Sequence, residues 1–212
     1  MIITKSKPKE VVLRSVGDRK RVFIVGCGTC ATLCQTGGEE QVEEMANLLR
    51  ERSVGKVVVE TPCDIRVLKR DLSPHLGMIE SADAILALCC GAGAQAISEL
   101  TGKIVIPGLD TLFLGETERI GRFYERCRAC GDCIIYETGG ICPIVRCAKG
   151  LLNGPCGGMA NGKCEAGGYM RDCAWVLIYR RLKELGMTQR FMEIRAVRDR
   201  SRRAEPQELR FR

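Results

Sequence analysis

Short apolar runs alternate with helical patterns through the first half of the chain. Four runs predict buried strands, because each is almost continuously apolar and only four or five residues long. They cover residues 21–25, 56–60, 84–88 and 103–106. Between them the spacing of apolar residues predicts helices at residues 39–52, 64–72 and 94–100. Strands that alternate with helices form a parallel sheet covered on both faces, so residues 21–115 are expected to form a four-stranded, Rossmann-like or flavodoxin-like α/β domain.

The pattern weakens on either side of this domain. Residues 1–20 are mostly polar, which predicts an N-terminal arm or a first helix. Residues 107–115 are expected to link the sheet to the second half of the chain, and residues 116–126 to form a short helix.

The second half has little periodicity until its end. Residues 127–173 show no regular apolar spacing and are expected to be irregular. Residues 174–186 place apolar side chains on one helical face, with a glycine as terminator. We therefore expect a cysteine-rich domain at residues 116–186, followed by a basic C-terminal tail at 187–212.

Cysteine dominates this second half. Eight of the fourteen cysteines lie here. Three of them form a C-x2-C-x2-C motif, and five more follow at wider spacing. They are Cys127, Cys130 and Cys133, then Cys142, Cys147, Cys156, Cys164 and Cys173. A closely spaced triple can hold an iron–sulfur cluster when a fourth cysteine, often followed by proline, arrives later. Cys142-Pro143 supplies that candidate, and eight thiolates would serve two 4Fe–4S clusters in place of a hydrophobic core.

The other six cysteines follow the predicted strands. Cys27, Cys30 and Cys34 come after the first strand, Cys63 after the second, and Cys89 and Cys90 after the third. The carboxyl ends of parallel strands share one edge, where open α/β sheets bind ligands. A further 4Fe–4S centre is expected there, with Cys27, Cys30 and one of Cys89 and Cys90 as preferred ligands and two bystanders among the six.

Other interpretations of the cysteines remain open. Structural zinc also takes four cysteines, usually as separated pairs, and zinc at one site is an alternative. Some of the six could instead be small buried apolar residues. Disulfides would need an oxidising compartment, whereas the first ten residues are polar and unlike a secretory leader. We therefore expect a reduced, cytoplasmic protein.

A glycine loop offers a different function. Residues 26–31 match G-x-G-x-x-A after a strand, a helix is expected to follow, and Glu60 ends the next strand where a ribose-binding acid would lie. An NAD(P)-binding oxidoreductase is thus an alternative. However, Cys27, Cys30 and Cys34 occupy the loop, and a dinucleotide-binding loop does not need thiols.

Composition excludes several functional classes. The formal net charge is +7, but residues 174–212 alone hold eleven Lys or Arg against five Asp or Glu. Aromatic residues are 5% of the chain, which is poor for stacking nucleic-acid bases. We expect no nucleic-acid binding and, without an apolar run of eighteen, no membrane span. His75 is the only histidine, and no triad, phosphate loop or carboxylate pair is evident, so a non-catalytic electron-transfer subunit is favoured.

Three short motifs carry a family resemblance. Residues 153–158 read NGPCGG, residues 162–165 read GKCE, and residues 173–175 read CAW. Together they resemble the methylenetetrahydrofolate reductase C-terminal-like domain. Over about residues 20–200 the chain resembles the small iron–sulfur subunits of MetVF-type methylenetetrahydrofolate reductases.

The resemblance implies a partner and a pathway for electrons. The partner would be a MetF-type flavoprotein subunit, a TIM barrel whose FMN reduces methylenetetrahydrofolate to methyltetrahydrofolate. This chain would supply two or three 4Fe–4S clusters, with FMN in the partner only. The electron donor would be a ferredoxin, or a hydrogenase or heterodisulfide-reductase type of assembly.

Overall fold

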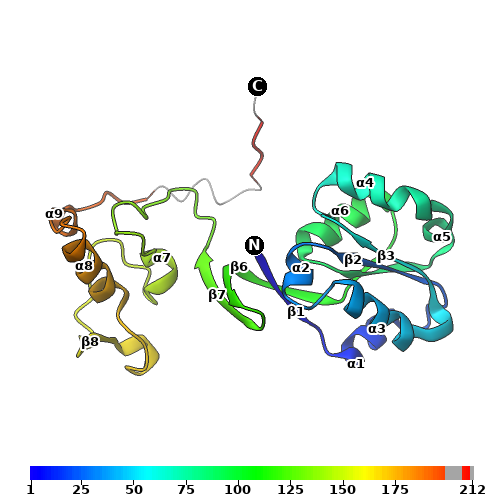
Figure 1. The fold of residues 1–212 in the computed structure, drawn as a ribbon, viewed down its shortest axis with the longest axis horizontal. Coiled ribbons are helices and arrows are strands. Elements are labelled where there is room, and N and C mark those ends of the chain that lie inside the picture. The colour runs from blue at the N-terminus through cyan, green and yellow to red at the C-terminus, as the bar shows by residue number, and fades with distance from the viewer. Residues whose placement is uncertain (199–206, 211–212) are drawn as a thin grey trace. The chain divides into compact units, whose positions relative to one another are not determined.

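The computed structural model describes residues 1–198 and 207–210 and divides into two compact units, Met1–Ala129 and Cys130–Arg212 (Figure 1). The boundary between units falls after residue 129, beyond the expected start of the cysteine-rich domain at residue 116. Part of the predicted basic tail, residues 199–206 and 211–212, lies outside the described residues.

A four-stranded parallel sheet forms the centre of the first unit, as the apolar runs predicted. The strand order is β3-β2-β4-β5. The strands are β2 (Val22–Cys27), β3 (Ser53–Val59), β4 (Ala84–Leu88) and β5 (Val105–Pro107). Every residue of β2 and β4 is buried, which explains why these strands are continuously apolar.

Helices cover both faces of this sheet, with α1 and α3 on one side and α4, α5 and α6 on the other (Figure 1). Their bounds are α1 (Lys9–Val16), α2 (Cys30–Leu33), α3 (Glu39–Leu49), α4 (Ile65–Leu72), α5 (Leu76–Ser81) and α6 (Gly91–Thr101). Two 3-10 turns, Arg50–Arg52 and Ser73–His75, extend α3 and join α4 to α5. The three helices predicted between the strands are confirmed within a few residues at each end.

A second, antiparallel sheet replaces the expected link and helix at residues 107–126. It consists of β1 (Ile2–Ser6), β6 (Leu109–Arg119) and β7 (Arg122–Cys127) in the order β1-β6-β7. The predicted helix at 116–126 is wrong, because Gly121 (φ +80°) turns the chain back and Phe123 and Tyr124 favour strand. For residues 1–20, where an arm or a first helix was predicted, α1 confirms the helix, and β1 precedes it in place of an arm.

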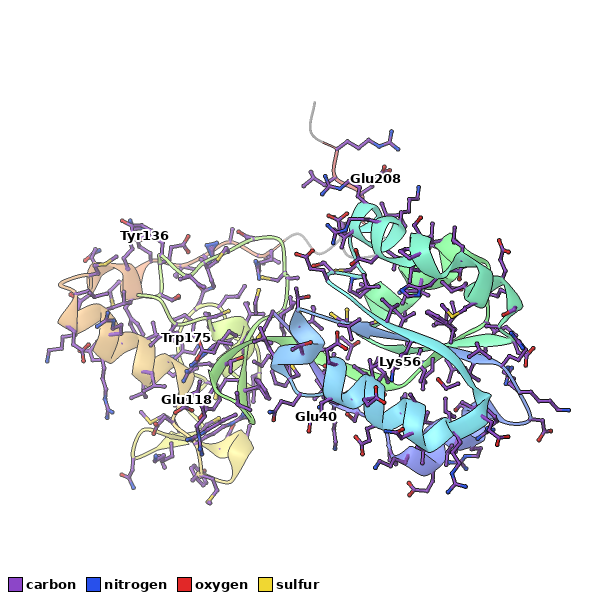
Figure 2. All side chains as sticks on the ribbon, turned by 45° about the vertical axis from the view of Figure 1, so that its right-hand side comes forward. Glu40, Lys56, Glu118, Tyr136, Trp175 and Glu208 are labelled. Atoms are coloured by element: carbon purple, nitrogen blue, oxygen red, sulfur yellow. The ribbon has the colours of Figure 1, made fainter. Side chains whose placement is uncertain are left out.

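The second unit has short elements around one longer helix. They are α7 (Pro143–Arg146), β8 (Met159–Ala160), β9 (Lys163–Cys164), the 3-10 turn Glu165–Gly167, α8 (Ala174–Glu184) and α9 (Gln189–Met192). Helix α8 confirms the predicted amphipathic helix. Its Trp175, labelled in Figure 2, packs with Ile178 and Leu182 in a small buried cluster, and the indole N–H donates to the Leu151 carbonyl at 3.2 Å.

None of the helices in the described residues has the length and apolar character that a membrane crossing requires. The longest, α3, α6 and α8, have 11 residues each.

Candidate metal centres

Five cysteines lie at the carboxyl edge of the parallel sheet. Cys27 ends β2, Cys30 begins α2, Cys63 lies in the loop after β3, and Cys89 and Cys90 follow β4. Because β2 lies between β3 and β4, these segments leave three neighbouring strands at the same edge. The sheet topology therefore brings together residues that are up to 63 positions apart in the sequence.

Electrostatic interactions show that these thiols are near one another. Cys63 is exposed, Cys30 is half-buried, and Cys27 and Cys90 are buried. Partial burial raises the pKa of the Cys63 thiol, and the negative charges of Cys90, Cys27 and Cys30 raise it further. Ionising the Cys63 thiol is therefore unfavourable unless positive charge is bound beside it.

The sheet-edge thiols also make hydrogen bonds. The backbone N–H of Ile2, in β1, donates to Cys30 Sγ at 3.5 Å, and Thr29 Oγ1 lies 3.4 Å from Cys27 Sγ. Donors to sulfur stabilise the thiolate form that a metal requires. The contribution of β1 was not predicted, because its sequence contains no metal-binding residue type.

Cys89 and Cys34 are placed differently from the other four. The Cys89 side chain is 1% exposed, and its Sγ lies 2.9 Å from where a Cβ on Gly93 would stand, so it packs against α6. Burial raises the pKa of the Cys89 thiol far above its usual range, with smaller contributions from Cys90, Cys27 and Cys63. The buried Cys34 thiol faces β1, where it donates to the Ile2 carbonyl at 3.8 Å.

The C-x2-C-x2-C run begins at the last residue of β7. Cys127 is exposed, and its Sγ accepts the backbone N–H of Ala129 at 3.3 Å. Ala129 has a positive φ of 47°, a backbone conformation that is costly for alanine. This turn aims a backbone amide at the sulfur of Cys127.

Cys130 has a cationic neighbour that the sequence did not reveal. Arg198 Nη2 donates to Cys130 Sγ at 3.4 Å, and Arg198 Nε lies 3.0 Å from Asp132 Oδ2. Burial acts to raise the pKa of the Cys130 thiol. The hydrogen bond from Arg198, the backbone hydrogen bonds at Asp132 and Cys130, and the charge of Arg198 together outweigh burial and hold that pKa below its usual value. The same guanidinium lowers the pKa of the Asp132 carboxyl.

The remaining cysteines of the second unit are placed by short local elements. Cys133 is exposed in the loop that follows Cys130. Five others adjoin helices, strands or turns: Cys142 and Cys147 flank α7, Cys156 precedes β8 and is exposed, Cys164 ends β9, and Cys173 immediately precedes α8 and is buried. Cys147 and Cys173 pack into the Trp175 cluster, so both have a structural contact besides any metal role.

No three His, Cys, Asp or Glu side chains in residues 1–198 and 207–210 are arranged to hold one metal ion. The donor chemistry nevertheless fits a zinc or iron–sulfur centre. The six cysteines from Cys27 to Cys90 and the eight from Cys127 to Cys173 offer thiols, which are the ligands that such centres use, and no histidine. The metal and its ligand sets therefore stay predictions.

Residues 106–201 match the family model described as Methylene-tetrahydrofolate reductase C terminal. This part of the chain is similar to the C-terminal region that the family model describes. The matched region contains all eight cysteines from Cys127 to Cys173 as well as Arg198, whereas the six cysteines from Cys27 to Cys90 precede it. Searches of curated proteins and of solved structures returned no match.

The glycine loop at residues 26–31 has a packing explanation. A Cβ on Gly26 would lie 2.5 Å from Val42 and 2.6 Å from the Gly37 carbonyl, and one on Gly28 would lie 3.2 Å from Glu60 Cα. Glu60 itself pairs with Arg70 at 2.8 Å. The helix directly after the loop, α2, has only four residues, and the longer α3 begins at Glu39. These features weaken the dinucleotide hypothesis.

Proposed function

We propose that this chain is the iron–sulfur electron-transfer subunit of a MetVF-type methylenetetrahydrofolate reductase. It would relay electrons to the FMN of a MetF-type flavoprotein subunit. The observation that carries the proposal is that all eight cysteines of the second half lie within the matched region. A ligand set made only of thiols suits a redox cluster better than a site for a carbon substrate.

Three groups of cysteines would hold the centres. Cys27, Cys30, Cys63 and Cys90 form the sheet-edge set, Cys127, Cys130, Cys133 and Cys142 the second set, and Cys147, Cys156, Cys164 and Cys173 the third. A 4Fe–4S cluster accepts and releases one electron at a time. Two or three such centres would therefore pass electrons singly, while the partner's FMN collects two for reduction of the methylene group.

The residues of this chain support that role by stabilising negative charge on sulfur. Ile2 donates to Cys30, Ala129 to Cys127 and Arg198 to Cys130. Each donor stabilises negative charge on sulfur and would therefore favour the more negative, reduced state of a centre. The electron source would be a ferredoxin, or a hydrogenase or heterodisulfide-reductase type of assembly.

A zinc-stabilised structural subunit is the second candidate. Cys147, Cys156, Cys164 and Cys173 are separated by seven or eight residues, without the close triple that favours iron–sulfur. Zinc at this set would fold the second unit and leave electron transfer to the other two.

The chain alone should not reduce methylenetetrahydrofolate, because its proposed centres carry electrons but offer no flavin. With reduced ferredoxin as donor, methyltetrahydrofolate should form only when the flavoprotein subunit is also present. Stopped-flow absorbance should show FMN reduction that depends on this chain. Turnover by the isolated chain, or equally fast FMN reduction without it, would contradict the proposal.

A further inference from the structure

We propose that residues 193–198 form a C-terminal strap that docks on the cysteine-rich unit and places Arg198 as a tuning residue for the centre held by Cys130. By donating to Cys130 Sγ, Arg198 would raise the reduction potential of that centre. The tuning role rests on the proposed function, whereas the docking of the strap does not.

The strap is fixed by a pair of backbone hydrogen bonds to one side chain. The Arg195 N–H donates to Asn153 Oδ1 at 2.8 Å, and Asn153 Nδ2 donates to the Arg195 carbonyl at 3.1 Å. The Arg195 guanidinium also lies 2.5 Å from Glu137 and 3.6 Å from Asp132. Arg195 is thus held through both its backbone and its side chain, whereas a residue of a solvated extension would lack such contacts.

Aromatic packing holds the chain just before the strap. Phe191, in α9, packs edge-on against Trp175 with ring centroids 5.9 Å apart, and against Tyr179 at 5.2 Å. Trp175 and Tyr179 both belong to α8. The residue just before the strap is therefore anchored to α8, and this contact fixes where the strap begins.

The Arg198 guanidinium binds three acceptors at the Cys130 turn. It contacts the Asp132 carboxylate, the Asp132 backbone carbonyl and Cys130 Sγ, and the Arg198 side chain is 9% exposed. The planar guanidinium group of arginine can donate to several acceptors at once, and a lysine ammonium group cannot reproduce this geometry. Low exposure also limits screening by salt, so the charge acts on the sulfur at close range.

The expected consequence is a higher reduction potential. A reduced cluster carries one more negative charge than the oxidised cluster, and hydrogen bonds to its sulfurs favour the reduced state. Asp132 neutralises part of the arginine charge but does not remove the N–H donated to sulfur. Loss of Arg198 should therefore lower the potential of one centre and leave the others unchanged.

Redox titration of the anaerobically purified full chain, followed by electron paramagnetic resonance, tests this role. Arg198→Gln should lower the midpoint potential of one centre, and Arg198→Lys should lower it less. Arg181→Gln is the matched control, because it removes the same charge from α8, where Arg181 pairs with Glu184 outside the strap. Equal potentials in Arg198→Gln and Arg181→Gln would overturn the tuning role.

Amide hydrogen exchange tests docking of the strap independently of the metal. A peptide covering residues 193–198 should be protected, and Asn153→Ala should remove that protection and also lower the same potential. Unprotected exchange in the parent chain would overturn the docking. Iron analysis separates the two failures: a chain without iron but with a protected strap would refute the proposed function and the tuning role, and leave the docking standing.

Discussion

Removing the metal should unfold the second unit and leave the first unit folded. The second unit has a small apolar core, in which Cys173, Trp175, Ile178 and Leu182 are the buried members of the described cluster. The corresponding cluster in the first unit has 25 buried residues drawn from all four parallel strands. A segment with so small a core takes its folding free energy from ligand binding, so the apo form should lose most of its structure there.

Hydrogen exchange before and after metal removal under reducing conditions measures this difference. Peptides of residues 130–192 should lose protection, whereas peptides of β2 and β4 should keep theirs and serve as the internal control. Restoring the metal should restore protection. Equal protection in both states would mean that apolar packing alone folds the second unit, which would remove the structural argument for a centre there.

Cys90→Ser should remove the sheet-edge centre, and Cys89→Ser should not. The two cysteines are adjacent in sequence and both interact electrostatically with the exposed Cys63, but Cys89 is 1% exposed and its side chain packs against α6. Loss of one ligand from a four-thiolate site should cost about four iron atoms per chain. Cys89→Ser places a hydroxyl in the core, so it should lower the free energy of unfolding instead.

Iron content and thermal unfolding of the two variants separate these effects. Cys90→Ser should lose iron, with the α/β unit still folded by circular dichroism. Cys89→Ser should retain iron and melt at a lower temperature. Cys34→Ser is a second control, because its thiol faces the Ile2 carbonyl. The assignment of ligands fails if Cys89→Ser or Cys34→Ser loses as much iron as Cys90→Ser.

The parallel sheet could be predicted from the sequence, because strands buried on both faces consist of continuous apolar runs. Residues 84–88 are wholly apolar, and all five are buried in β4. The β6–β7 hairpin was not predicted, because its burial is only partial and its charged residues fit a helical surface equally well. Pairing with β1, more than 100 residues earlier, stabilises that hairpin, and local propensity cannot reveal such a distant partner.

The candidate site was predictable where topology alone places residues together. Cysteines after neighbouring parallel strands had to meet at one edge, and the structure places Cys27, Cys63 and Cys90 there. Arg198 could not be predicted, because its contact with Cys130 spans 68 residues and depends on the docking of a segment without periodic pattern. Charge counting identified a basic tail but gave no indication of which arginine lies at a thiol.

Metal analysis of the anaerobically purified chain tests the central claim most directly. Iron, acid-labile sulfide and zinc should be quantified per chain, alongside the absorbance before and after dithionite. The account predicts about eight to twelve iron atoms with matching sulfide, as two or three 4Fe–4S clusters require, and a brown colour that bleaches on reduction. One or two zinc atoms without iron would contradict electron transfer and make this chain a structural subunit.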